Sequence, residues 1–241
     1  MWGCGITNNK GIVVVVKSIK IMFIGIFVFL LLYLGIIWVW ASFSASVLIR
    51  ETLLTSREVS LLPEQQRVLL KIEDPVFFEH HGLNVSNGQG LTTITSALAR
   101  DIFLYGHRLH GVSGVMQSFY RAVFDCCKKV DIGRDVMALV LNRHVTKNEQ
   151  LNFLLSTAYM GRKDGNSIVG FDRAAMAYYD KPLGDLSLQE FSGLVAMVAA
   201  PTYYHPLNNP EAHALRTARI INIANGQCEP DGLLDLTYEH C

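Results

Sequence analysis

The sequence has no excess of charge of either sign, because 21 lysine and arginine residues balance 21 aspartate and glutamate residues. This balance argues against a nucleic-acid-binding surface and against an acidic tail. The five cysteines include no Cys-x-x-Cys pair and no Cys/His group at metal-ligand spacing, so we predict no zinc site. Internal repeats and the alternating apolar and polar runs typical of strands are also missing. The sequence therefore offers no signal for long strands.

Charged residues are absent from positions 21–43, which read IMFIGIFVFLLLYLGIIWVWASF. About 20 apolar residues are enough to span a bilayer. Trp38 and Trp40 lie near the end of the run, where interfacial aromatic residues are common. The run is longer than the apolar part of a signal peptide, and no small-residue cleavage site is evident. We therefore predict a retained transmembrane helix.

The basic residues around this helix predict its orientation. Lys10, Lys17 and Lys20 precede it, whereas Arg50 follows it and is offset by Glu51. The positive-inside rule then places the N-terminus in the cytoplasm and the rest of the single-pass protein outside. The expected order is a cytoplasmic N-terminus (1–20), the transmembrane helix (21–43), an amphipathic connector (44–62), a domain (63–226) and a C-terminal tail (227–241).

The cysteines fit an exported domain only in part. Cys4 would be cytoplasmic and reduced. Cys228 and Cys241 bracket a short C-terminal segment, and we predict a disulfide that closes this loop. Cys126 and Cys127 are adjacent, so a bond between them would be strained, and we expect one or both to be buried thiols.

Two carboxylates, Glu73 and Asp74, stand at the end of an apolar helical run within the stretch 71–82, KIEDPVFFEHHG. We expect Pro63 to open the helix that carries them. Partial desolvation at such a helix end raises the pKa of a carboxyl group and suits it to proton transfer near neutral pH. On these residues alone, the alternative is a solvated helix end with a charged pair.

A second helix is predicted in the segment GLTTITSALARDIF, where Ile94, Ala97, Leu98 and Ile102 fall on one face. Clustered threonines at its start offer hydroxyls and backbone amides to an anion, and the helix dipole favours a phosphate there. A simple helix cap is the alternative.

The pattern E-D-x-x-F-x-x-H-x-G, formed by Glu73, Asp74, Phe77, His80 and Gly82, resembles the first motif of the peptidoglycan glycosyltransferases, glycosyltransferase family 51. The second helix is similar to the family's second motif, through Thr93, Ile94, Thr95 and Arg100, with Thr92 in place of a serine. Lys147 and the segment 168–206 are similar to later family elements, and the resemblance covers about residues 63 to 225.

The resemblance implies a mainly α fold, in which a transmembrane helix precedes a two-lobed, lysozyme-like helical domain with Glu73 and Arg100 in the cleft. Glu73 would be the general base on the 4-hydroxyl of an acceptor sugar of lipid II, which attacks a polyprenyl-pyrophosphate-linked donor. Arg100 would face the pyrophosphate. The implied substrate-binding residues are Asp74, Phe77, His80, Gly82, Thr92, Thr93, Thr95, Arg100, Gln117 and Lys147.

Other expectations follow from the same resemblance. A divalent cation, Mg²⁺ or Mn²⁺, is compatible with the pyrophosphate, and no organic cofactor is expected. Because a polyprenyl substrate is met at the bilayer surface, the protein is expected in the inner (cytoplasmic) membrane, with its domain on the periplasmic or outer face.

The family's third motif, R-K-x-x-E, lacks its glutamate here. One alignment places Arg134 at that position and another places Gln117. Three interpretations therefore stay open: an active lipid II glycosyltransferase, a catalytically impaired relative that binds lipid II or cell-wall assembly proteins, and a lysozyme-like hydrolase with Glu73 as general acid.

Overall fold

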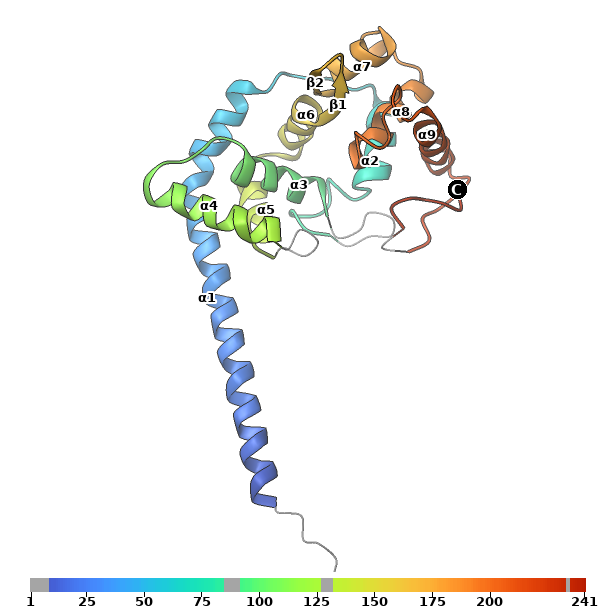
Figure 1. Cartoon of the computed structure of the whole chain (residues 1–241). Helices are drawn as coiled ribbons and strands as arrows, with labels where there is room; N and C mark the ends of the chain where they lie inside the picture. Colours follow the sequence, from blue (N-terminus) through green and yellow to red (C-terminus); the bar gives the residue numbers. More distant parts are fainter. Residues whose placement is uncertain (1–8, 85–91, 127–131, 233–234) are drawn as a thin grey trace, which may run out of the picture.

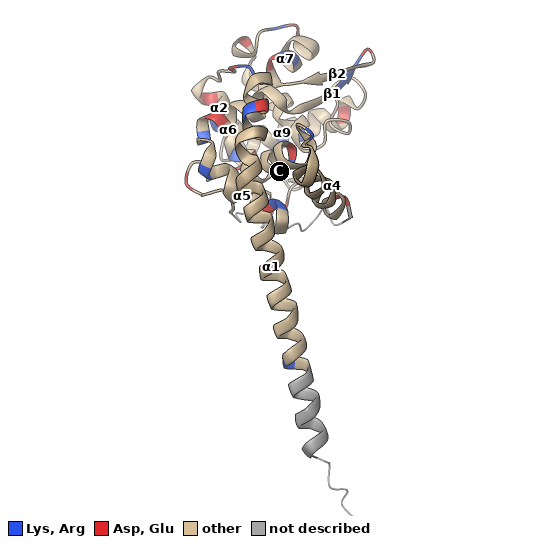
Figure 2. Ribbon diagram, turned by 90° about the vertical axis from the view of Figure 1, so that its left-hand side faces the viewer, with Lys and Arg blue, Asp and Glu red and all other residues tan. Residues whose placement is uncertain are grey.

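A long helix leads into a helical domain (Figure 1). Helix α1 (Asn9–Thr55) is long and apolar enough from Ile19 onward to cross a membrane, by length and composition. Figure 2 shows its long tan stretch, which corresponds to the uncharged sequence between Lys20 and Arg50. The structure, a computed structural model, describes residues 9–84, 92–126, 132–232 and 235–241.

Helix α1 is longer than the predicted span 21–43 and takes in most of the expected connector, since it continues to Thr55. The helix continues because its last part has an apolar stripe of its own. Ala41, Ala45 and Leu48 recur at helical spacing and are almost fully buried. This stripe packs against helix α5 of the domain. The membrane-span candidate and the domain core therefore share one continuous helix.

The domain consists of two groups of helices, as the predicted two-lobed fold requires. The first group packs on the end of α1 and contains α3 (Ile94–Ala99), the π-helix η1 (Arg100–Tyr105), α4 (Gly111–Cys126) and α5 (Ile132–His144). The second contains α2 (Pro63–Glu73), α7 (Phe171–Tyr179), the 3₁₀ turn η2 (Leu183–Asp185), α8 (Leu188–Ala199) and α9 (Pro210–Ala224). Helix α6 (Lys147–Thr157) contacts α3 and α7, so it joins the two groups.

The helix starts follow the sequence signals closely. Pro63 occupies the first turn of α2, where its fixed φ and missing N–H are tolerated. Thr146 and Glu149 form a capping box before α6, in which the carboxylate of Glu149 accepts from the backbone N–H of Thr146 at 2.8 Å. The equivalent contact between Glu190 and Ser187 opens α8 at 2.8 Å.

A short antiparallel hairpin was not expected from the sequence. Strand β1 (Tyr159–Lys163) pairs with β2 (Asn166–Val169). Asp164 and Gly165 between them have φ of 52° and 79°, as a two-residue hairpin turn with positive φ at both positions requires. The strands are too short to show an alternating pattern, so the turn dipeptide was the only local signal.

Helix α4 carries Val115, Phe119 and Ala122 at helical spacing, and these three side chains are exposed. Its opposite face packs on α1, where Trp40 Nε1 donates to the Ser113 carbonyl oxygen at 3.1 Å. The Tyr120 ring lies 5.0 Å from the Trp40 ring, between centroids. An apolar face of α4 therefore points away from the domain.

Candidate active site

Glu73 is the last residue of α2 and lines a cleft of about 560 Å³. Buried Val68, Leu69 and Ile72 fix its helix in the second group, while Asp74 ends the helix. Burial raises the pKa of Glu73 to about 7, although the charge of Arg216 lowers it and that of Asp74 raises it further. Glu73 therefore has the proton affinity of an acid–base group at neutral pH.

Both groups of helices contribute to the wall of this cleft. Arg100, Asp101 and Tyr105 come from η1, opposite Glu73 of α2. The full set is Glu73, Ala97, Arg100, Asp101, Tyr105, Leu154, Thr157, Ala158, Tyr159, Val198 and Pro201. Glu73 and Arg100 thus share one cleft, the arrangement expected from the sequence.

Arg100 stands where the α-helical turns of α3 change to the π-helical turns of η1. Such π turns inside helices are frequent at functional sites. Its Nε donates to the Asp101 carboxylate at 2.6 Å, and the Arg100 side chain is 38% exposed. The positively charged guanidinium of Arg100 is therefore accessible from the cleft.

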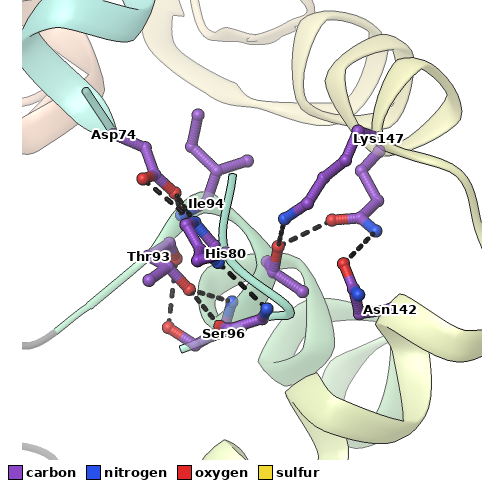
Figure 3. Close-up of polar contacts among 10 residues, drawn as sticks. Asp74, His80, Thr93, Ile94, Ser96, Asn142 and Lys147 are labelled. Atoms are coloured by element: carbon purple, nitrogen blue, oxygen red, sulfur yellow. Dashed lines mark hydrogen bonds and ion pairs between the residues drawn. The ribbon is translucent and has the colours of Figure 1, made fainter. Parts of the chain in front are cut away.

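Asp74, next to Glu73, ties the end of α2 to the start of α3 (Figure 3). Its fully buried carboxylate accepts from the backbone N–H of Ile94 at 3.0 Å and from His80 Nε2 at 2.9 Å. The Nδ1 atom of His80 accepts from the Gly82 N–H at 2.9 Å, so Nε2 carries the proton. The first motif thereby fixes Glu73 relative to the helix that leads to Arg100.

Gly82 and Thr93 complete this tie. Gly82 has φ of +116°, and a Cβ added there would lie 2.9 Å from the Ala138 carbonyl oxygen of α5. Thr93 Oγ1 donates to the Gly82 carbonyl oxygen at 2.6 Å and accepts from the Ser96 N–H at 3.0 Å, so it also caps α3.

Asp74, His80, Gly82 and Thr93 form a hydrogen-bonded frame behind the cleft, and Lys147 connects α6 to it. Its Nζ donates to Thr95 Oγ1 at 3.0 Å and lies 4.4 Å from the centroid of the buried Phe77 ring. Burial lowers the pKa of Lys147 to about 8, while the charge of Asp74 opposes this shift. Thr95 in turn donates to Gln150 Oε1 at 2.7 Å.

Comparison with known proteins identifies the domain. A model of the Transglycosylase family matches residues 48–225, which is most of the chain. The chain belongs to this family. The match includes the cleft and both motifs that line it.

The transglycosylase relatives are penicillin-binding proteins. Penicillin-binding protein 1B of Buchnera aphidicola is 30% identical over 149 residues, or 60% of this chain and 18% of the relative. Penicillin-binding protein 1F of Bacillus subtilis is 27% identical over 173 residues, or 70% of this chain and 23% of the relative. Penicillin-binding protein 1B of Escherichia coli is 27% identical over 173 residues, or 66% of this chain and 18% of the relative. The chain thus spans about a fifth of the length of these relatives.

The site residues predicted from the transglycosylase motifs divide into two sets. Glu73 and Arg100 reach the cleft, and Thr92 is exposed at the start of α3. The others contribute to the frame behind the cleft, and their substrate-binding role stays a prediction. These are Asp74, Phe77, His80, Gly82, Thr93, Thr95 and Lys147.

Neither candidate for the third-motif position supplies a carboxylate. Gln117 in α4 is 3% exposed, and its amide donates to the carbonyl oxygens of Phe103 and His107 at 2.9 and 3.0 Å. These bonds give Gln117 a structural role in the turn before α4. Arg134 in α5 is 5% exposed, pairs with Asp135 at 2.7 Å and donates to Thr92 Oγ1 at 3.4 Å.

The predicted disulfide between Cys228 and Cys241 is present, with Cα atoms 5.7 Å apart. The predicted buried thiols cannot be compared in the same way, since Cys127 and the side chain of Cys126 lie outside the described residues. Sequence reasoning missed Tyr238 of the tail, which lies near Glu73 and has its pKa raised to about 12, by burial and then by the charge of Glu73. No spacing or motif pointed to it.

Proposed function

We propose that this protein elongates lipid II glycan with Glu73 as the general base. The observation that carries the proposal is the shared cleft, in which Glu73, with its pKa of about 7, faces the side of η1 that holds Arg100. Ionised Glu73 takes the proton of the acceptor 4-hydroxyl as that oxygen bonds to the anomeric carbon of the donor. The bond from that carbon to the polyprenyl pyrophosphate breaks, with inversion at the carbon.

Arg100 has the complementary role in this proposal. Negative charge builds on the pyrophosphate as it leaves, and a cation placed in the cleft stabilises it. Arg100 is paired with Asp101, so the guanidinium is held in place before the substrate arrives. Thr92, which is exposed just before α3, would offer a further hydroxyl to the phosphates.

A divalent cation, Mg²⁺ or Mn²⁺, stays part of the proposal as a group that would neutralise charge on the pyrophosphate. Within the described ranges, one trio of side chains has ligand atoms close enough to hold an ion, Cys228, His240 and Cys241, and the two cysteines are bonded to each other. The described part of the cleft therefore has no preformed metal site. Asp101 is a cleft carboxylate that would contact a cation carried by the phosphates.

Membrane anchoring through α1 is the second part of the proposal, with the N-terminus in the cytoplasm. Helix α4 supports it, because it packs on α1 at Tyr33 and Trp40, inside the apolar span. If that span crosses the bilayer, then α4 lies at the depth of these residues. Its exposed Val112, Val115 and Phe119 would then face lipid.

A catalytically impaired relative that binds lipid II or cell-wall assembly proteins is the second candidate. The observation that favours it is Arg134, a buried cation where one alignment expects the third-motif glutamate. A carboxylate that supports the donor would then be missing.

Polymerisation of labelled lipid II by the full-length protein in detergent with magnesium tests the proposal. Wild type is expected to make polymer, Glu73→Gln to lose at least about 100-fold of the rate, and Arg100→Ala to lose less. Glu79→Gln is the matched control, since Glu79 lies in the same stretch and is exposed. Polymer from Glu73→Gln at the wild-type rate would reject Glu73 as the base. Lipid II binding without polymer from the wild type would favour the impaired relative.

A further inference from the structure

The C-terminal tail lies beyond the family match at 48–225 and folds back on the domain. The Cys228–Cys241 disulfide closes it into a loop, and Figure 1 shows the chain end beside α9. Asn222 of α9 donates to the Cys241 carbonyl oxygen at 2.7 Å, and Arg219 donates to that of Thr237 at 3.1 Å. The loop is therefore fixed to α9 at several points.

Tyr238 carries the loop into the interior. It is 3% exposed, and its hydroxyl donates to the carbonyl oxygen of Ile72, the residue before Glu73, at 3.4 Å. Its φ of 54° is in the left-handed region, which costs energy for a non-glycine residue. The Asp235 carboxylate supports this conformation, because it accepts from the Tyr238 N–H at 2.9 Å.

Arg216 of α9 is held mainly by the same loop. Its guanidinium is buried, donates through Nη1 to the Leu236 carbonyl oxygen at 2.8 Å, and lies over the rings of Tyr204 and Tyr238, 4.7 and 5.4 Å from their centroids. Its Nε makes no hydrogen bond to the residues that the structure describes. The charge of Arg216 acts on Glu73 across this contact region.

We propose that residues 235–241 of the disulfide-closed tail are a positioning element of the active site, which holds Arg216 beside Glu73 through Leu236 and Tyr238. The role of Glu73 rests on the proposed function. Arg216 and Tyr238 are positioning residues, because the described lining of the cleft includes neither. In this arrangement the buried cation stabilises the ionised carboxylate that accepts the proton.

The direction in which the pKa of Glu73 should shift follows from the groups around this residue. Loss of the loop frees Arg216 to move, which removes a nearby positive charge and favours the protonated carboxyl group. Burial is the largest cause of the raised pKa of Glu73, and in Tyr238→Leu an apolar side chain still fills the site, so the loss of the Arg216 charge decides the direction of the shift. The titratable groups outside the loop remain in place. They are Asp74 at the helix end and Arg100, Asp101, Tyr105 and Tyr159 in the cleft.

The test follows Glu73 directly, by ¹³C NMR titration of the full-length protein labelled at the glutamate carboxyl carbons, with the signal assigned by Glu73→Gln. Tyr238→Leu and Cys228→Ser with Cys241→Ser are expected to move the midpoint upward. They should also lower polymerisation at about pH 6 by about threefold, with recovery at about pH 8.5. Tyr203→Leu, at an exposed tyrosine outside the loop, is the matched control and should move neither.

An unchanged midpoint in a folded Tyr238→Leu protein would overturn the proposal. If that variant does not fold, reduction of the disulfide in the wild type gives the same comparison, and an unchanged midpoint would again reject it. A wild type that makes no polymer would count against the proposed function alone, because the titration still decides whether the loop acts on Glu73.

Discussion

At the scale of single residues, Glu73 shows how one helix end separates two adjacent carboxylates. Asp74 is fully buried but receives hydrogen bonds from Ile94 and His80, so its carboxylate connects the end of α2 to the start of α3. Glu73 is partly exposed to the cleft, and burial dominates its proton affinity. Of these two adjacent residues, Asp74 therefore connects α2 to α3, and Glu73 is the group that titrates near neutral pH.

The pH dependence of the rate is the first consequence. A general base must be ionised, so polymerisation should rise by about tenfold per pH unit below the pKa of Glu73 and level off above it. The pKa of about 7 places this limb between about pH 5 and 7. Initial rates measured from pH 5 to 9 check this, and a limb at pH 4.5, the ordinary value for a glutamate, would contradict it.

The stability of the fold should respond in the opposite direction. Because the folded-state pKa of Glu73 lies above 4.5, the ordinary value for a glutamate, ionisation destabilises the fold. The penalty is absent below about pH 4.5, grows up to about pH 7 and is complete above it. After allowance for partial exposure, Glu73→Gln should stabilise the protein by about 1–2 kcal/mol at about pH 8. Thermal unfolding at about pH 4.5 and 8 measures this, with Glu79→Gln as a control that should change little.

At the scale of elements, the frame of Asp74, His80, Gly82 and Thr93 joins α2, α3 and α5. Gly82→Ala should destabilise this joint by about 2–4 kcal/mol, since the φ of +116° is strained for alanine and the new Cβ would approach Ala138 to 2.9 Å. Gly184→Ala is the control, because a Cβ there meets nothing within 4 Å. Chemical denaturation of both variants checks the difference, and equal stability would count against the frame.

Helix α4 gives a prediction about lipid contact. A photoreactive benzoyl-phenylalanine in place of Phe119, which is 53% exposed on the outer face of α4, should cross-link to lipid in reconstituted vesicles. The same replacement at Leu215, which is 55% exposed on α9, should not. Equal cross-linking at both positions would show that α4 does not enter the bilayer.

Helices with a strong local signal could be predicted from the sequence, because their caps and stripes act within a few residues. Pro63 and the apolar spacing after Thr92 both predicted helices that the structure contains. The continuation of α1 past Phe43 could not be predicted in this way. Its small residues, such as Ala41 and Ala45, are buried only because α1 packs against α5, which is distant in the sequence.

The candidate site shows the same limit. The motif residues predicted that Glu73 and Arg100 share a cleft, but they did not show that Thr93 and Thr95 are buried behind it. Nor did they point to Tyr238, whose position depends on a disulfide and on long-range contacts with Ile72 and Arg216. Tertiary contacts of this kind leave no periodic pattern.

At the scale of the whole molecule, the orientation of the chain has a direct test. If the N-terminus is cytoplasmic, a protease added to right-side-out membrane vesicles should digest the domain after α1 and spare an N-terminal tag. In inverted vesicles, the domain should survive and the tag should be lost. Western blots against the two ends measure this, and the reverse pattern would contradict the positive-inside prediction.

The unbroken course of α1 also fixes the distance between its exposed apolar part and the cleft. Its far end is built into the domain core, so each residue added to the exposed apolar part moves the cleft along the helix axis by about 1.5 Å. No contact inside the domain has to change for this to happen. If α1 crosses the bilayer, the length of this apolar part therefore sets the distance between the cleft and the acyl chains, independently of the chemistry in the cleft.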